Sequence, residues 1–135
     1  MNNTVGGITL ISFDDFKIED GSPIYLQIVR HVKRGLVAET ILDNDELPSR
    51  RMLSALLGVN PNTVQKAYQL LEEEGLIRSR AGAGSCVTLS AGAAARIRAE
   101  LTEQEARRFA EAMRRMGLTK EEAAARLDEV WGEDE

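Results

Sequence analysis

The sequence predicts a mainly α-helical protein with one small β-hairpin, in the order of three helices, a hairpin and two further helices. Along most of the 135 residues, apolar side chains recur at steps of three and four, which is the period of an amphipathic helix. The period shortens around "AGAG" at residues 81–84, where a short apolar run on either side is typical of two strands and a turn. The length fits one small domain with a helical appendage.

The composition excludes several classes of protein. Hydrophobic residues make up 43% of the chain and charged residues 29%, which is ordinary for a protein with a modest core. We see no apolar run near the roughly 18 residues of a membrane span, and no signal-peptide pattern at the N-terminus. Cys86 and His31 are the single cysteine and histidine, so neither a disulfide framework nor a zinc site is expected. We therefore expect a cytoplasmic protein without a metal, a cofactor or a membrane partner.

The first elements precede the most informative part of the chain. Residues 1–22 predict an N-terminal tail, partly extended or disordered, with one alternating apolar piece at "ITLISF". The first helix follows, with Ser22 as its cap and Pro23 at its first helical position. A second, short helix is predicted between a Ser49 cap and a Gly58 stop, after the polar loop "LDNDELP".

The third helix is predicted from "NPNTVQKAYQLLEEEG" at residues 60–75. Asn60 is a good N-cap, Pro61 suits the first helical position, and Gly75 suits a left-handed stop. Val64 and Leu71 belong to an apolar stripe that also includes Tyr68. The opposite face is formed by amides, a hydroxyl and a lysine, with no acid before the last turn: Asn62, Thr63, Gln65, Lys66 and Gln69.

Residues 91–135 predict a helical dimerisation region. "TKEE" at 119–122 is a capping box that starts the last helix. "TEQE" at 102–105 resembles a second box, so a break of the preceding helix near Thr102 stays open, although a continuous helix is favoured. The apolar stripes of these two helices need a surface on which to bury, and they supply the predicted dimer interface. Its residues are Ile97, Leu101, Phe109, Met113, Met116, Leu127, Val130 and Trp131.

Three helices and a hairpin, with the tight connection "GVNP" between the second and third helices, predict a winged helix-turn-helix over residues 23–90. In that geometry the third helix enters the major groove of DNA, where amides, hydroxyls and basic groups match base edges and phosphates. The net charge is −5, yet residues 48–71 contain three basic residues and no acid, and residues 76–90 add Arg78 and Arg80. Local positive charge is what a phosphate backbone meets.

The stretch "LPSRRMLSALLGVNPNTVQKAYQLLEEEGLIRSRAGAGSCV" resembles the DNA-binding domain of GntR-family bacterial transcription regulators, and "NPNTVQKAY" resembles their YtrA-like subgroup. The resemblance runs from about residue 23 to residue 89. It implies that Arg51 contacts DNA, that the first turn of the third helix reads bases, and that the wing tip lies in the minor groove. Together with the residues of the polar face and their neighbours, the predicted DNA-binding residues are Ser49, Arg50, Arg51, Asn60, Pro61, Asn62, Thr63, Gln65, Lys66, Tyr68, Arg80, Gly82 and Gly84.

Some of these assignments have alternatives. Arg50 is equally well interpreted as a solvated neighbour of Arg51, and Tyr68 is better interpreted as core, with a hydroxyl that reaches a phosphate as the alternative. Several relatives have a base-reading arginine where this sequence has Pro61, and often another in place of Gln65. The operator of this protein therefore cannot be assumed to match theirs.

The function predicted is a dimeric repressor that binds a pseudo-palindromic operator on double-stranded DNA, with its own transporter-containing operon as the target that the resemblance implies. The short C-terminal region leaves open whether a small-molecule effector exists. The alternative is a winged helix that serves as a protein-interaction module without specific DNA binding. An enzyme is not expected, because the sequence has no nucleophile–histidine–acid set, and "AGAGS" lacks the lysine of a phosphate-binding loop.

Overall fold

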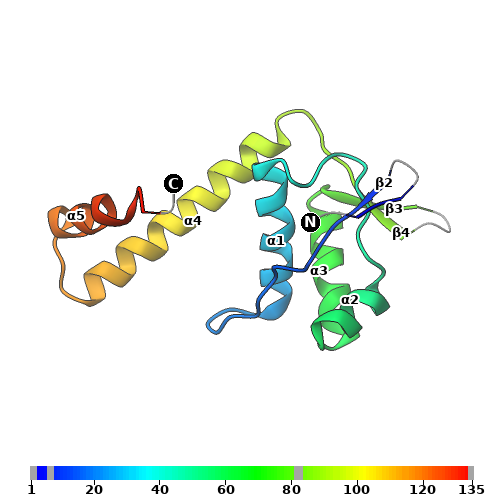
Figure 1. Ribbon diagram of the computed structural model, residues 1–135, viewed down its shortest axis with the longest axis horizontal. Helices are drawn as coiled ribbons and strands as arrows, with labels where there is room; N and C mark the ends of the chain where they lie inside the picture. The colour runs from blue at the N-terminus through cyan, green and yellow to red at the C-terminus, as the bar shows by residue number, and fades with distance from the viewer. Residues whose placement is uncertain (1–2, 6–7, 81–83, 134–135) are drawn as a thin grey trace. The chain divides into compact units, whose positions relative to one another are not determined.

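The computed structural model of the protein describes residues 3–5, 8–80 and 84–133, with side chains from residue 9 onward (Figure 1). The chain forms two compact units, Met1–Ile97 and Arg98–Glu135. The architecture is mainly helical with small antiparallel hairpins, a winged helix-turn-helix followed by C-terminal helices. None of the helices in the described ranges is long and apolar enough to cross a bilayer.

Within the described residues, the first unit contains three helices and two hairpins, and it includes the beginning of a fourth helix. Helices α1 and α3 lie side by side, and α2 packs against α3 (Figure 1). Strands β3 and β4 pair antiparallel, with Ile77 opposite Val87 and Arg80 opposite Gly84. The elements are β1 (Asn3–Val5), β2 (Ile8–Leu10), α1 (Ile24–Ala38), α2 (Arg50–Leu57), α3 (Pro61–Glu73), β3 (Ile77–Arg80), β4 (Gly84–Val87) and α4 (Ala93–Arg115).

The core of the first unit lies where the helices meet the wing. Each helix contributes its apolar stripe, as the three- and four-residue steps predicted. Side chains that are 2% exposed or less come from every element of the winged helix-turn-helix: Ile28, Val32, Leu36, Leu53, Val64, Ala67, Tyr68, Leu71, Leu76, Ile77, Cys86 and Val87. Leu56, three residues after the buried Leu53 on α2, is 60% exposed instead.

The N-terminal segment contributes short strands and buried side chains to the first unit. Strands β1 and β2 form an antiparallel hairpin. The chain then pairs with the loop before α2, since the Ile11 amide donates to the Glu46 carbonyl (2.8 Å) and the Glu46 amide donates to the Thr9 carbonyl (2.9 Å). Ile11 and Phe13 are buried, at 2% and 4% exposure. This segment is therefore part of the folded unit.

The same loop joins the N-terminal segment to the wing. Glu46 forms a parallel bridge with Leu10 and an antiparallel bridge with Cys86. The next amide, that of Leu47, donates to the Ser85 carbonyl at 3.0 Å. The loop therefore acts as a short strand between the two hairpins, directly before the residues that start α2.

Helix α1 starts differently from the prediction. Its N-cap is Pro23, and no side chain caps it. The Ser22 hydroxyl accepts a hydrogen bond from the Arg30 side chain at 3.2 Å instead. Pro23 has an extended backbone (φ −58°, ψ 142°), which places it one residue before the helix.

The second unit consists of the rest of α4 and of α5 (Lys120–Val130). The predicted capping box is present: the Glu122 amide donates to the Thr119 hydroxyl (3.2 Å), and the Thr119 amide donates to the Glu122 carboxylate (2.9 Å). Helix α4 is continuous through Thr102. The Thr102 hydroxyl donates to the Arg98 carbonyl at 2.8 Å, so it bonds back into its own helix and does not cap a new one.

Candidate nucleic-acid interface

The helix-turn-helix begins at a capped α2. The Ser49 hydroxyl accepts a hydrogen bond from the Met52 amide at 3.0 Å, as predicted for an N-cap. Gly58 ends the helix with a left-handed backbone (φ +68°), which a residue with a side chain adopts only at a cost. The buried Ser54 hydroxyl donates to the Val59 carbonyl at 2.6 Å. These bonds fix the tight turn that leads from α2 into α3.

Helix α3 presents the polar face predicted from the sequence. Its Asn60 cap accepts a hydrogen bond from the Asn62 amide at 2.8 Å, and Pro61 occupies the first helical position. The side chains of Pro61, Asn62, Gln65 and Lys66 are exposed, and Thr63 is half-buried. An amide-rich face is therefore open to a partner along the first two turns of the helix.

Tyr68 is a core residue, which is the interpretation that the sequence favoured over a DNA contact. Its side chain is 1% exposed, and its hydroxyl donates to the Pro48 carbonyl at 2.7 Å. Burial raises the pKa of the Tyr68 phenol, although the positive charge of Arg50 opposes this shift. The hydroxyl is thus a neutral donor committed to the protein, and it does not reach a phosphate.

Arg50 and Arg51 have different surroundings. Arg51 is exposed, whereas Arg50 is half-buried, with its guanidinium carbon 5.2 Å from the centroid of the Tyr68 ring. The Arg50 Nε is buried and has no hydrogen-bond acceptor among the described residues. Buried N–H donors are normally paired, so the Arg50 Nε is an exception that no contact among the described residues explains.

Lys66 rests on an aromatic ring that the sequence did not mark as functional. Its ammonium lies 4.2 Å from the ring centroid of Tyr25, in the first turn of α1. This cation–π contact restrains an exposed side chain that the sequence alone leaves free. Sequence reasoning missed Tyr25 because its place on the α1 stripe is also that of a core residue.

The wing carries basic residues up to its tip. Arg80 is half-buried and pairs with Gly84, and Arg78 is exposed on the same strand. Gly84 has a left-handed backbone (φ +75°), so the position favours glycine. Gly82, which is predicted to contact DNA, lies outside the described residues.

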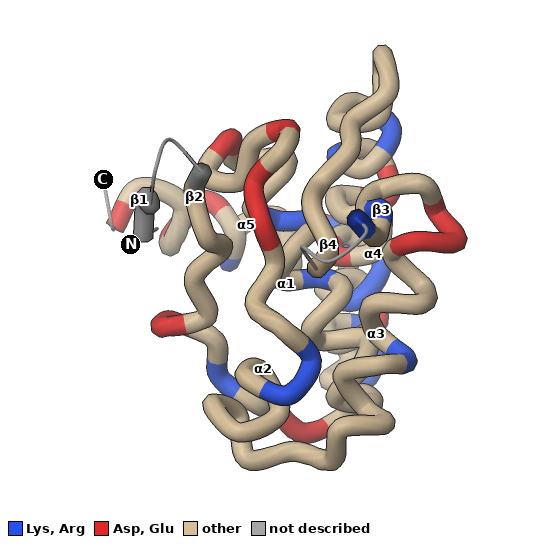
Figure 2. The backbone as a smooth tube through the Cα atoms, turned by 90° about the vertical axis from the view of Figure 1, so that its right-hand side faces the viewer, with Lys and Arg blue, Asp and Glu red and all other residues tan. Residues whose placement is uncertain are grey.

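The acids of α3 gather at its C-terminal end, where each has a partner. The Ser79 hydroxyl donates to Glu72 at 3.2 Å, and the amide of Gln69 donates to Glu73 at 3.4 Å. Glu74 binds the buried ammonium of Lys33 at 2.9 Å. Basic positions in turn lie at the start of α2 and in the middle of α3 (Figure 2). The charge on this helix is therefore segregated along its axis.

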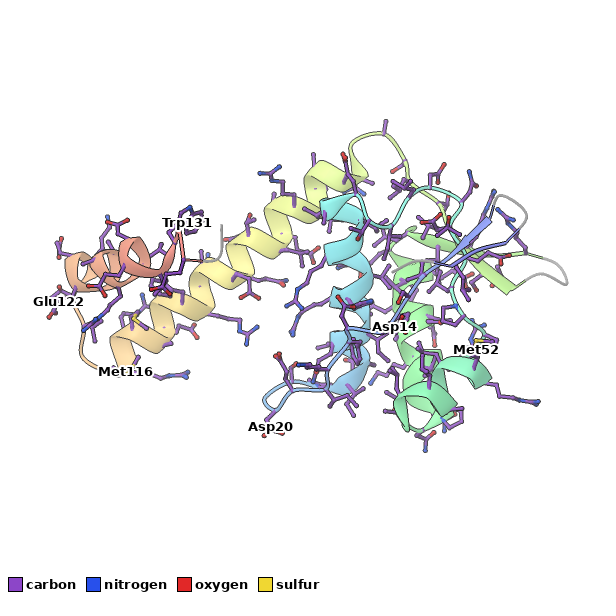
Figure 3. The ribbon with its side chains drawn as sticks, in the orientation of Figure 1. Asp14, Asp20, Met52, Met116, Glu122 and Trp131 are labelled. Carbon is purple, nitrogen blue, oxygen red and sulfur yellow. The ribbon has the colours of Figure 1, made fainter. Side chains whose placement is uncertain are left out.

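The predicted dimer residues fall into three groups. Ile97 is 4% exposed and belongs to the first unit, so the structure corrects its assignment: its side chain is already covered within the chain. Leu101, Phe109 and Met113 are half-buried on α4. The second unit also exposes large apolar side chains at the end of α4 and along α5, two of which are labelled in Figure 3: Met116 (65%), Leu127 (38%), Val130 (55%) and Trp131 (73%).

Comparison with known proteins places this arrangement in context. A family model described as "Bacterial regulatory proteins, gntR family" matches residues 24–87. The chain is 35% identical over 108 residues to the HTH-type transcriptional regulator YhcF of Bacillus subtilis, spanning 80% of this chain and 89% of that protein. It is 40% identical over 70 residues to the HTH-type transcriptional repressor YtrA of the same organism, spanning 52% of this chain and 54% of that protein.

Solved structures agree with these matches. A GntR family transcriptional regulator from Listeria monocytogenes has a TM-score of 0.70 and 33% identity, covering 84% of this chain and 99% of that chain. YtrA from Sulfolobus acidocaldarius, a GntR-family transcription factor, has a TM-score of 0.54 and 31% identity, covering 73% of this chain and 99% of that chain. The likeness therefore extends from the winged helix into the C-terminal helices.

Proposed function

Since this chain belongs to the GntR family of bacterial transcription regulators, we propose that it is a dimeric repressor that binds a pseudo-palindromic operator. The observation that carries the proposal is the acid-free, exposed face on the first two turns of α3 beside the basic start of α2. A face of this kind suits the major groove, whose base edges offer hydrogen-bond donors and acceptors within a strongly negative surface.

Base reading is assigned to the first turns of α3. The amides of Asn62 and Gln65 can each pair with the two polar atoms of an adenine edge, and Thr63 can bond to several bases. Pro61 supplies an apolar surface next to them. Arg51, exposed at the start of α2, suits a bidentate contact to guanine.

Phosphate binding is assigned to the groups around this face. Arg50 is half-buried with its guanidinium over the Tyr68 ring, and the Lys66 ammonium is restrained over the Tyr25 ring. Ser49 and Asn60 cap the two helices, and the free amides of a helix N-terminus favour phosphate. Arg80 and Gly84, which pair at the end of the hairpin, suit entry of the wing into the minor groove.

The partner in this proposal is a second copy of the chain. Apolar side chains as exposed as Met116, Val130 and Trp131 need cover, and a two-fold dimer would present two recognition helices to half-sites about 34 Å apart. Repression follows by analogy with YtrA of Bacillus subtilis, whose name states that it is a repressor. We propose that it acts in the cytoplasm on its own operon.

The test uses the full chain and a random-sequence duplex library. We expect the protein to enrich one pseudo-palindromic duplex, bound by two chains as judged by sedimentation. Arg51→Ala should lower affinity for that duplex by roughly 1–3 kcal/mol, about 5- to 150-fold, and relax preference at one base pair. Lys66→Ala should weaken selected and scrambled duplexes alike and reduce the salt slope by about one.

Arg126→Ala is the matched control, because this exposed arginine lies on α5 and pairs with Glu129 there. Its affinity for the selected duplex should be that of the wild type. Enrichment of no duplex even at low salt would favour the alternative, a winged helix that binds protein. Unchanged affinity in both Arg51→Ala and Lys66→Ala would refute the assignment of these two contacts.

A further inference from the structure

Tyr68 contacts the start of α2 at two points. Its hydroxyl donates to the Pro48 carbonyl, two residues before α2, and its ring lies 5.2 Å below the guanidinium carbon of Arg50, the first residue of that helix. Both contacts come from one side chain of α3 that points into the core and away from the polar face. One residue thus links the helix that reads DNA to the first arginine of α2.

Core packing alone does not explain a tyrosine here. The stripe of α3 is otherwise apolar, and a buried hydroxyl costs free energy unless it forms a hydrogen bond. The phenol satisfies the carbonyl of Pro48, a residue that is itself buried. A leucine or phenylalanine would fill most of the same volume, but it would leave that carbonyl without the donor.

The ring also restricts the direction of Arg50. A guanidinium held over an aromatic ring by a cation–π contact keeps its N–H groups as donors for other acceptors. The Arg50 Nε is buried and has no acceptor among the described residues, so the ring contact restrains this half-buried side chain without itself satisfying that donor. A side chain ordered before binding loses less conformational freedom when a ligand arrives, and this preorganisation raises affinity.

We propose that Tyr68 is a positioning residue for DNA binding: its ring orients Arg50 toward a DNA phosphate, and its hydroxyl fixes the start of α2 relative to α3. The inference rests on the proposed function, because it requires that Arg50 contacts DNA. It differs from the interpretation in which the Tyr68 hydroxyl itself contacts DNA. Here the residue acts from inside the core, through a neighbour.

A double-mutant cycle tests the proposal with the duplex that the wild-type chain selects. In the wild-type background, Arg50→Ala should lower affinity about tenfold, as expected for the loss of a charged hydrogen bond. In the Tyr68→Leu background the same substitution should cost only about two- to threefold, because Arg50 is no longer oriented. Lys66→Ala gives the control cycle, since Lys66 lies over Tyr25: its effect should be the same with and without Tyr68.

A purely structural role for Tyr68 predicts a different result. Tyr68→Leu would then lower affinity by one factor in every background, and the Arg50 cycle would be as independent as the Lys66 cycle; that result overturns the proposal. If Tyr68→Leu fails to fold, as judged by circular dichroism, Tyr68→Phe replaces it. If the effect of Arg50→Ala on affinity then differs about twofold or more between the Tyr68→Phe and wild-type backgrounds, the result supports the role of the hydroxyl in fixing the start of α2. Independent effects of the two substitutions overturn that role.

The proposed function can fail separately. If the wild-type chain selects no duplex, DNA binding itself is wrong. If it selects a duplex but Arg50→Ala binds as tightly as the wild type, the Arg50 contact is wrong, and with it the role of Tyr68. If Arg50→Ala weakens binding and the cycle shows no coupling, only the positioning role is refuted.

Discussion

Gly35 lies in the interior of α1, and the absence of a side chain there makes room for the turn that follows the helix. Its carbonyl accepts the amides of Thr40 and Ile41, both at 3.0 Å, so the chain folds back over this position. A Cβ built on Gly35 would lie 2.6 Å from the Cγ1 of Ile41 and 3.2 Å from its Cβ, with the Cδ1 closer still. Ile41 is 4% exposed and has little room to move.

We therefore expect Gly35→Ala to destabilise the protein, although alanine is the better helix former. Overpacking a core costs about 1–3 kcal/mol, whereas replacing glycine by alanine inside a helix gains about 1 kcal/mol. The net loss should therefore be up to about 2 kcal/mol in the free energy of unfolding, measured by urea denaturation. The cost should become smaller in an Ile41→Ala background, because that substitution removes Cγ1 and Cδ1.

The control is Gly132→Ala, since a Cβ at Gly132 meets nothing within 4 Å. Its free energy of unfolding should stay near that of the wild type. If Gly35→Ala stabilises the protein, helix propensity outweighs packing and the reasoning from the Ile41 contact is wrong. Equal costs of Gly35→Ala with and without Ile41 would refute it as well, because the cost would then arise elsewhere.

Two further predictions address the helix caps. Asn60→Asp should keep the N-cap of α3 and a melting temperature close to that of the wild type, but its new negative charge should weaken DNA binding. Asn60→Ala should instead lower the free energy of unfolding by about 1 kcal/mol, because it removes the cap. An Asn60→Asp variant that binds DNA as tightly as the wild type would contradict the proposed interface. Hydrogen bonds from the Thr119 backbone amide, and then from its side chain, hold the pKa of Glu122 below its usual value. The capping box therefore stabilises the fold fully above the unfolded-state pKa of about 4.3. This stabilisation is lost as the pH falls through the lower folded-state pKa. Thermal melts between about pH 6 and pH 3 should show a larger loss for the wild type than for Glu122→Gln, and parallel losses would exclude this role.

The helix caps and helix ends were predictable from the sequence, because they depend on residues that are neighbours along the chain. Ser49, Asn60 and Thr119 cap their helices because each side-chain oxygen meets an amide two or three residues later in the chain. Gly58 ends α2 for a similarly local reason. The exposed amide face of α3 follows from the helix period once the apolar stripe is known.

Contacts between distant residues were not predictable in the same way. The alternation in "ITLISF" indicated an extended segment, but its partner at Glu46 lies more than thirty positions along the chain. Tyr68 has a polar end that reaches Pro48, and a stripe position does not reveal what that end contacts. Ile97 continues the stripe of α4, yet it falls within the first unit, and helical periodicity does not show where one unit ends.

The pairing of the N-terminal segment with Glu46 affects where the boundaries of a DNA-binding fragment should be placed. The family match begins at residue 24, after this segment, and ends at residue 87, before Ile97. A fragment with those limits would lack four buried apolar side chains of the first unit, Ile11, Phe13, Ala93 and Ile97, and would leave the Glu46 strand without one neighbour. An unpaired strand beside an uncovered apolar surface is a template for aggregation. The unit that can be transplanted into a chimaeric regulator is therefore longer at both ends than the residues 24–87 that the family model matches.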